Sequence, residues 1–244
     1  MSERYRPYRP PEPPPYRRPW SLAGLLDHFF AFAAVTLAGW LVSVVLEWCG
    51  IAFGWWALPG AGHSEGLLRT ELDWLNRDFA APETAARLIG WAYWGAGQLY
   101  RWSGLEWVVR WVVSDGPGAW PGLELLRAAL RAFGDYLLAA AYITQLTGAR
   151  LGVVLLAVPA FAVTGLMGAV DGLVRRDLRR FGGGQESSFM YHHLKKTVRP
   201  MFSVPVFLYL ISPWSVHPTY LFVPFALLFG YFVQRTLGKF KKYL

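Results

Sequence analysis

The chain has 244 residues, of which 54% are hydrophobic and only 16% are charged, and its formal net charge is +8. This composition, which includes 13 tryptophans, excludes an ordinary soluble domain and indicates an all-α integral membrane protein. A membrane-spanning helix needs about 20 mostly apolar residues, and several stretches without Lys, Arg, Asp or Glu approach that length.

Residues 1–27 are predicted to be a Pro- and Arg-rich cytoplasmic arm, and the prolines within residues 1–20 exclude helix there and predict extended chain. The arm is either a docking peptide for a partner or a basic tail that helps to set topology. The first transmembrane helix is predicted at residues 28–48. It begins too late and is too long for a cleavable signal, so we expect it to remain as an anchor. The single cysteine, Cys49, excludes an internal disulfide.

Residues 49–149 are predicted to be a periplasmic or interfacial helical segment. Apolar residues spaced three and four apart predict amphipathic helices over 67–79 and 123–138. Four charged residues are expected on the wet face of the first helix: Glu71, Asp73, Arg77 and Asp78. An uncharged run, 136–149, is short for a span and is predicted to continue as helix into the next one.

Tryptophans crowd the middle of this segment: Trp91, Trp94, Trp102, Trp107, Trp111 and Trp120. Such aromatic residues concentrate at the bilayer surface, so we expect helices that lie against the outer leaflet. A carbohydrate-stacking platform is the alternative.

The second span is predicted at residues 150–170. Three acidic residues are expected at span boundaries, which argues against an ion relay: Asp27, Glu47 and Asp171. A strip of small residues would let another helix approach closely: Gly165, Gly168 and Gly172. Glycine tolerated near a helix end is the alternative explanation for that strip.

Residues 171–198 are predicted to form a basic helix, a glycine hinge and a second helix. Four arginines would make two ridges on the first helix: Arg175 with Arg179, and Arg176 with Arg180. Three glycines would end it: Gly182, Gly183 and Gly184. Ser187 or Ser188 would cap the next helix, over about 189–198. Anionic phospholipids are the commonplace partner of such an element.

Residues 199–234 are predicted to be a hairpin of the third and fourth transmembrane helices, and residues 235–244 are a basic tail. With four spans, the segments that share a side with the termini carry 16 basic and 6 acidic residues, against 8 and 10 for residues 47–150. The positive-inside rule therefore places both termini and the 171–198 element in the cytoplasm.

The basic element does not match several known chemistries. Gln185 and Glu186 follow the glycines where a phosphate-binding loop needs Lys and Ser or Thr. Adjacent His192 and His193 would point about 100 degrees apart on a helix, which disfavours a metal site. Ser187 with His192 and Glu186 lacks the glycine-flanked elbow of a catalytic serine. DNA contact by the arginines would be weak and salt-dependent.

The strings Arg176-Asp177-Leu178-Arg179-Arg180-Phe181-Gly182-Gly183-Gly184, Glu186-Ser187 and Tyr191-His192-His193 are unusual. In these strings and in its layout of four spans, the chain resembles the integrating conjugative element membrane protein family. The resemblance implies that the chain is an inner-membrane accessory of a bacterial type IV secretion system that moves single-stranded DNA. It also implies a place beside the coupling ATPase of that system.

Our hypothesis is a non-enzymatic, four-span inner-membrane component without cofactor that docks conjugative transfer proteins. The predicted docking residues are Arg175, Arg176, Arg179, Arg180, Gly182, Gly183, Gly184, Glu186, Tyr191, His192 and His193. The predicted helix-packing residues are Gly165, Gly168 and Gly172. The alternatives are a membrane-embedded enzyme or transporter acting on lipid or envelope substrates, and a DNA-binding anchor.

Overall fold

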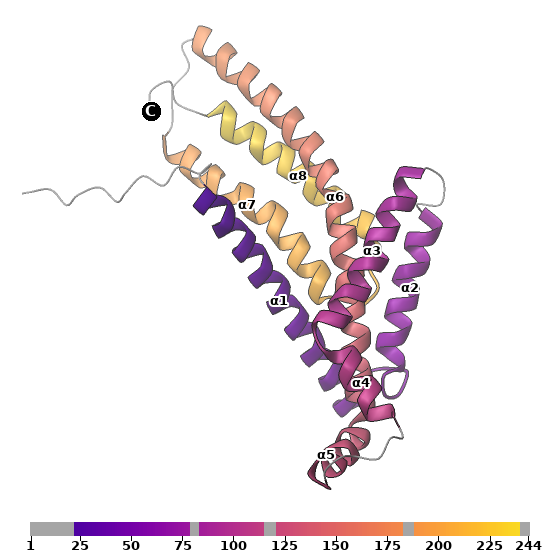
Figure 1. Ribbon diagram of the computed structural model, residues 1–244. Coiled ribbons are helices and arrows are strands. Elements are labelled where there is room, and N and C mark those ends of the chain that lie inside the picture. The colour runs from indigo at the N-terminus through magenta and orange to yellow at the C-terminus, as the bar shows by residue number, and fades with distance from the viewer. Residues whose placement is uncertain (1–21, 79–82, 115–120, 183–187, 240–244) are drawn as a thin grey trace, which may run out of the picture. The chain divides into compact units, whose positions relative to one another are not determined.

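The computed structural model describes residues 22–78, 83–114, 121–182 and 188–239, and these residues form α-helices without any strand. The helices, in chain order, are α1 (Leu22–Phe53), α2 (Gly62–Asp78), α3 (Glu83–Trp102), α4 (Leu105–Val113), α5 (Pro121–Ala132), α6 (Gly134–Phe181), α7 (Ser188–Ile211) and α8 (Pro218–Gly238) (Figure 1). The chain divides into two units, Met1–Val35 and Thr36–Leu244. In the first unit, the rings of Phe29 and Phe30 meet edge to face. The contacts described below lie within the second unit.

Three helices are long and apolar enough to cross a membrane within the described parts of the chain. They are Phe29–Phe53 of α1, Gly134–Arg179 of α6 and Pro218–Gly238 of α8. The sequence predicted four spans. Helix α7, the expected third span, is not among the three, because its first half carries His192, His193, Lys195 and Lys196.

Helix α6 is a single helix of 48 residues. At 1.5 Å per residue it is about 72 Å long, which is more than twice the thickness of the hydrocarbon core. The predicted continuation of residues 136–149 into the second span is confirmed, because the helix has no break at Arg150. Only part of α6 can therefore lie in hydrocarbon. The helix ends at Phe181 with Gly182 as its C-cap, where the glycine run was expected to end it.

Helix α7 runs without interruption from Ser188 to Ile211, whereas the sequence predicted a cytoplasmic helix ending near residue 198 before a separate span. Pro200 and Pro205 lie inside α7. Proline is tolerated inside apolar helices when neighbouring helices support the freed backbone. Helix α7 packs against α8, and Pro205 and Val206 are buried there. The expected caps at Ser187 and at Gly183 and Gly184 fall outside the described residues.

Helices α6 and α8 run side by side and have the most extensive contact between any two of the described helices (Figure 1). A Cβ atom at Gly165 would come within 2.7 Å of the Phe229 ring, and one at Gly172 within 2.6 Å of the Gln234 carbonyl oxygen. A Cβ atom at Gly168 would overlap the carbonyl group of Gly230. The three glycines expected to pack a helix thus lie against α8.

A second close contact, between α3 and α6, was not anticipated from the sequence. A Cβ atom at Gly148 would lie 2.5 Å from the Cα atom of Ala96, and one at Gly152 would lie 2.6 Å from the Cβ atom of Ala92. Both pairs are four residues apart, which puts each on one helix face. Small residues at this spacing let two helices approach closely.

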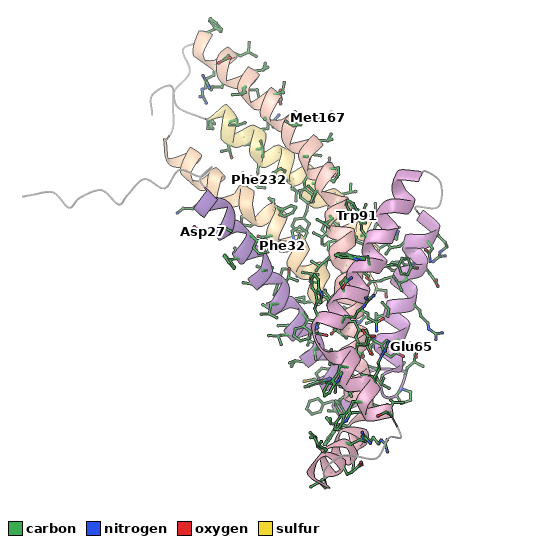
Figure 2. All side chains as sticks on the ribbon, viewed as in Figure 1. Asp27, Phe32, Glu65, Trp91, Met167 and Phe232 are labelled. Carbon is green, nitrogen blue, oxygen red and sulfur yellow. The ribbon has the colours of Figure 1, made fainter. Side chains whose placement is uncertain are left out.

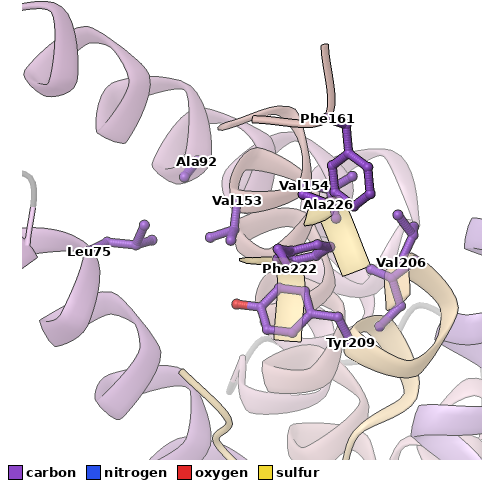
Figure 3. Close-up of a cluster of buried hydrophobic side chains, with 10 residues drawn as sticks. Leu75, Ala92, Val153, Val154, Phe161, Val206, Tyr209, Phe222 and Ala226 are labelled. Atoms are coloured by element: carbon purple, nitrogen blue, oxygen red, sulfur yellow. The ribbon is translucent and has the colours of Figure 1, made fainter. Parts of the chain in front are cut away.

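The buried core gathers side chains from five helices (Figure 3). It comprises Leu75, Ala92, Val153, Val154, Phe161, Val206, Tyr209, Leu210, Phe222 and Ala226. Aromatic rings fill its centre, and Phe161 and Tyr209 each meet Phe222 edge to face. On the surface, many large apolar side chains are exposed, among them Trp91 of α3 and Met167 of α6 (Figure 2).

Candidate functional site

The second unit contains a buried ion pair between α6 and α2. The side chains of Arg150 and Glu71 are 1% and 4% exposed. Nη2 of Arg150 lies 2.5 Å from Oε1 of Glu71, and Nε lies 3.1 Å from both carboxylate oxygens. Nη1 donates to the backbone oxygens of Leu210 and Ser212, and Nη2 also donates to that of Trp214 at 3.5 Å. A buried charge is costly unless it is paired, so this cluster holds α2, α6 and the α7–α8 turn together.

Aromatic residues surround the ion pair. The Tyr209 hydroxyl donates to Oε2 of Glu71 at 3.4 Å, and the Arg150 guanidinium lies 5.3 Å from the centre of the Tyr209 ring. His217 caps α8, because its Nδ1 accepts the backbone N–H of Thr219 at 3.4 Å. The ring of Trp74 lies 5.4 Å from that of His217.

A cavity of about 430 Å³ adjoins this cluster. Glu71, Trp74, Tyr209 and His217 form its polar end, and the other lining residues are mainly apolar: Leu75, Val153, Leu156, Ala157, Ala160, Pro218, Thr219, Phe222 and Val223. Ligand sites in proteins usually combine an apolar wall of this kind with a few placed polar groups. We call this space the α2–α6–α8 cavity.

The structure corrects the prediction that Glu71 lies on the wet face of its helix. Asp73 and Arg77 are exposed as expected, but Glu71 is buried. Glu71 shares the inward stripe of α2 with Leu68 and Leu75, which lie three and four residues away. Two features of the sequence could have indicated this buried ion pair. Glu71 occupies a position of the apolar stripe of its helix, and Arg150 is a lone arginine between two uncharged runs.

A second buried carboxylate, Glu47, lies inside α1, six residues before the helix ends at Phe53. Its predicted place at a span boundary stays a prediction. Its side chain is 2% exposed and bonds to Nδ1 of His63 at 2.9 Å. The His63 ring stacks on Trp56 with ring centres 3.9 Å apart, and the Trp56 indole donates to the Glu47 backbone oxygen. This cluster joins the end of α1 to the start of α2. In the described residues, no group of three or more His, Cys, Asp or Glu could hold a metal ion.

The predicted basic residues lie at the end of α6. Nε of Arg175 donates to Asp171 at 3.0 Å, and Gln234 of α8 donates to the same carboxylate. Nε of Arg176 lies 3.7 Å from Oδ1 of Asp177. The side chain of Arg179 is half-buried. Tyr191, His192 and His193 lie in the first turns of α7. The side chains of these three residues and of Arg180, and all of Glu186, are outside the described part of the chain.

The end of α6 extends past its partner helix (Figure 1). A Cβ atom at Gly172 would contact Gln234 and Leu237, near the end of α8. Residues 173–181, which we call the α6 end, continue for about 13 Å beyond that point. Val174, Leu178 and Phe181 lie on one face of it and are 51%, 66% and 92% exposed. The predicted arginines therefore share this segment with an exposed apolar stripe.

Trp91, Trp94 and Trp102 lie in α3, and Trp107 and Trp111 lie in α4, whereas Trp120 is outside the described residues. Trp91, Trp94 and Trp102 line a groove of about 480 Å³ between α3 and α6. The floor of this groove includes Gly148 and Gly152. The expectation that these helices lie against the outer leaflet stays a prediction.

The family described as "IncC plasmid conjugative DNA transfer protein DtrJ-like" matches residues 55–241, which is more than half of the chain. The chain belongs to the DtrJ-like family. The sequence-based expectation of a conjugative transfer family is confirmed. No curated protein and no solved structure matches the chain. The range shared with the DtrJ-like family contains both the α2–α6–α8 cavity and the α6 end.

Proposed function

We propose that this chain is a non-catalytic inner-membrane accessory of a conjugative DNA-transfer apparatus of the type IV secretion kind, carried by an integrating conjugative element. Its DtrJ-like membership supports a role in conjugation, and its three long apolar helices support a membrane location. Helix α7, which packs on α8, would be a fourth crossing. Both termini and the α6 end would then face the cytoplasm, as the distribution of Lys and Arg favours.

The observation that carries the docking role is the α6 end. Leu178 and Phe181 are apolar and largely exposed on a helix that has passed the end of α8. An apolar stripe flanked by Arg175, Arg176 and Arg179 suits a partner groove that is apolar at its floor and acidic at its rim. We propose the coupling ATPase of the same apparatus as that partner, with anionic phospholipids as additional contacts of the arginines.

Co-purification in mild detergent from donor cells tests this role. We expect the coupling ATPase to be recovered with the wild-type chain and to be lost, by about tenfold, when Arg175, Arg176, Arg179 and Arg180 become Ala. Conjugation frequency should fall in the same variant. The matched control replaces four exposed arginines of α2, α3 and α4 with Ala: Arg69, Arg77, Arg101 and Arg110.

The control variant should retain the ATPase. Equal recovery of the ATPase with both variants would refute docking through the α6 end. A chain that purifies alone and turns over a lipid would instead support the membrane-enzyme alternative.

A further inference from the structure

We infer that the α2–α6–α8 cavity binds a membrane lipid whose headgroup carries a primary ammonium, with one acyl chain between α6 and α8. Phosphatidylethanolamine is the lipid of this chemistry. The inference does not depend on the docking role of the α6 end, because it concerns different residues and a different ligand.

The cavity lies where a membrane-spanning helix begins. The apolar stretch of α8 starts at Pro218, and Pro218, Thr219, Phe222 and Val223 line the cavity. Trp214 and Tyr220, on either side of this start, are 67% and 80% exposed. Exposed Trp and Tyr at the end of an apolar helix are typical of the headgroup level of a bilayer. The polar end of the cavity is therefore at the depth of lipid headgroups.

The remaining walls suit an acyl chain. Leu156, Ala157 and Ala160 follow one another along α6, and Val223 faces them from the first turns of α8. These side chains offer no hydrogen bond, and they lead away from Glu71 along the direction of the spans. A volume of about 430 Å³ is within the range of about 300–1,000 Å³ that is usual for ligand sites.

The polar end selects a headgroup that donates hydrogen bonds. Arginine has five N–H groups, and those of Arg150 are directed to Glu71 and to the backbone oxygens of Leu210, Ser212 and Trp214. Arg150 thus has no donor left for a lipid phosphate. The Glu71 carboxylate lines the cavity as an acceptor.

A primary ammonium matches these groups. It can donate to the Glu71 carboxylate, and the aromatic ring of Trp74, which lines the same cavity, is a side chain of the kind that attracts cations. The phosphate of the same lipid would lie at the start of α8, where the helix dipole favours an anion. A choline headgroup has no N–H to donate, and the hydroxyl groups of a glycerol headgroup are neutral donors, which form weaker hydrogen bonds to a carboxylate than an ammonium does.

Native mass spectrometry of the full chain in detergent tests the inference. The delipidated protein is titrated with phosphatidylethanolamine, phosphatidylglycerol or phosphatidylcholine that carry the same acyl chains. We expect phosphatidylethanolamine to bind about tenfold more tightly than the other two. Binding of either other lipid with the same affinity would overturn the headgroup assignment.

Two variants locate the lipid. Ala160→Phe fills the apolar part of the cavity and should abolish the preference for phosphatidylethanolamine, whereas Ala162→Phe adds the same ring to an exposed position of α6 that does not line the cavity and should retain it. If Ala160→Phe does not purify as a folded species, Val223→Trp on α8 fills the same space. Retention of the preference in the folded cavity-filling variant would overturn the site.

Discussion

At the scale of single residues, Arg150 is a buried cation that pairs with Glu71 and donates to three backbone oxygens. Arg150→Met leaves the Glu71 carboxylate buried without its counter-charge and removes the donor from three backbone oxygens. Breaking a buried ion pair from one side typically costs about 3–5 kcal/mol. We expect a loss of that size in the free energy of unfolding, measured by denaturant titration in detergent micelles.

The double variant Arg150→Met with Glu71→Leu separates the two contributions. It removes both charges, so it should be more stable than Arg150→Met alone. It should still be less stable than the wild type, because the carbonyls of Leu210 and Ser212 lose their donor, at about 1–3 kcal/mol for each buried group. A double variant no more stable than Arg150→Met would contradict the pairing.

The sequence could predict only half of this cluster. Arg150 stands out because uncharged runs flank it, but its partner, 79 positions away, is brought close only by the packing of α2 on α6. Glu71 was assigned to the wet face because charged residues usually are exposed. The spacing of Glu71 from Leu68 and Leu75 supported the opposite placement. The prediction gave more weight to the charge of Glu71 than to its spacing from the apolar residues of the helix. The structure shows that the spacing indicated the correct, buried placement.

At the scale of helices, the glycines of α6 determine how closely α8 can approach. Gly168→Ala would place a methyl group on the Gly230 carbonyl, and that backbone cannot move aside as a side chain can. We expect the unfolding free energy to fall by about 1–3 kcal/mol. Thermal unfolding of the purified chain in detergent measures the change.

Gly90→Ala is the matched control for this substitution. Gly90 lies in helix α3, and a Cβ atom there would have no neighbour within 4 Å. Alanine should be neutral or stabilising at that position, by up to about 1 kcal/mol, because it favours helix. A similar loss in both variants would indicate that α6 and α8 are not in the close contact described.

Helix positions were easier to predict from the sequence than their ends and neighbours. Long apolar runs indicated α1, α6 and α8, and the glycine run marked where α6 ends. The α3–α6 contact was missed because Ala92 and Ala96 are unremarkable in a helix until a facing pair of glycines is known. The continuity of α7 was missed because the basic residues up to 198 and the apolar residues from 199 were assigned to separate helices, whereas α7 runs through Pro200 and packs on α8.

At the scale of the whole molecule, the sidedness of the chain is open to direct measurement. In a Cys49→Ser background, single cysteines at Asp73 and Phe181 occupy exposed positions at opposite ends of the proposed topology. We expect an impermeant thiol reagent to label the Asp73→Cys chain in intact spheroplasts and to label the Phe181→Cys chain only after the membrane is opened.

Labelling of both cysteines from outside would mean that an even number of crossings separates residues 73 and 181, so that the α6 end is outside, and the cytoplasmic docking role would be withdrawn. The family assignment would be unaffected, because it depends on the match over residues 55–241. At this scale the composition indicated a membrane protein, and the resemblance of the basic element to a known family implied conjugative transfer. The number of crossings depends on α7, which packs on α8 but is not among the three helices that are long and apolar enough to cross a membrane.

Arg150 and Phe181 belong to one unbroken helix, and the rise between them is about 46 Å. A rod of that length acts as a lever about the Arg150 cluster. A tilt of about 5 degrees there would displace the tip by about 4 Å, which is comparable to the rise of nearly three residues. In the proposed topology, a movement at the Arg150 cluster would in this way reach the cytoplasmic end of the helix through the segment that contains Pro159.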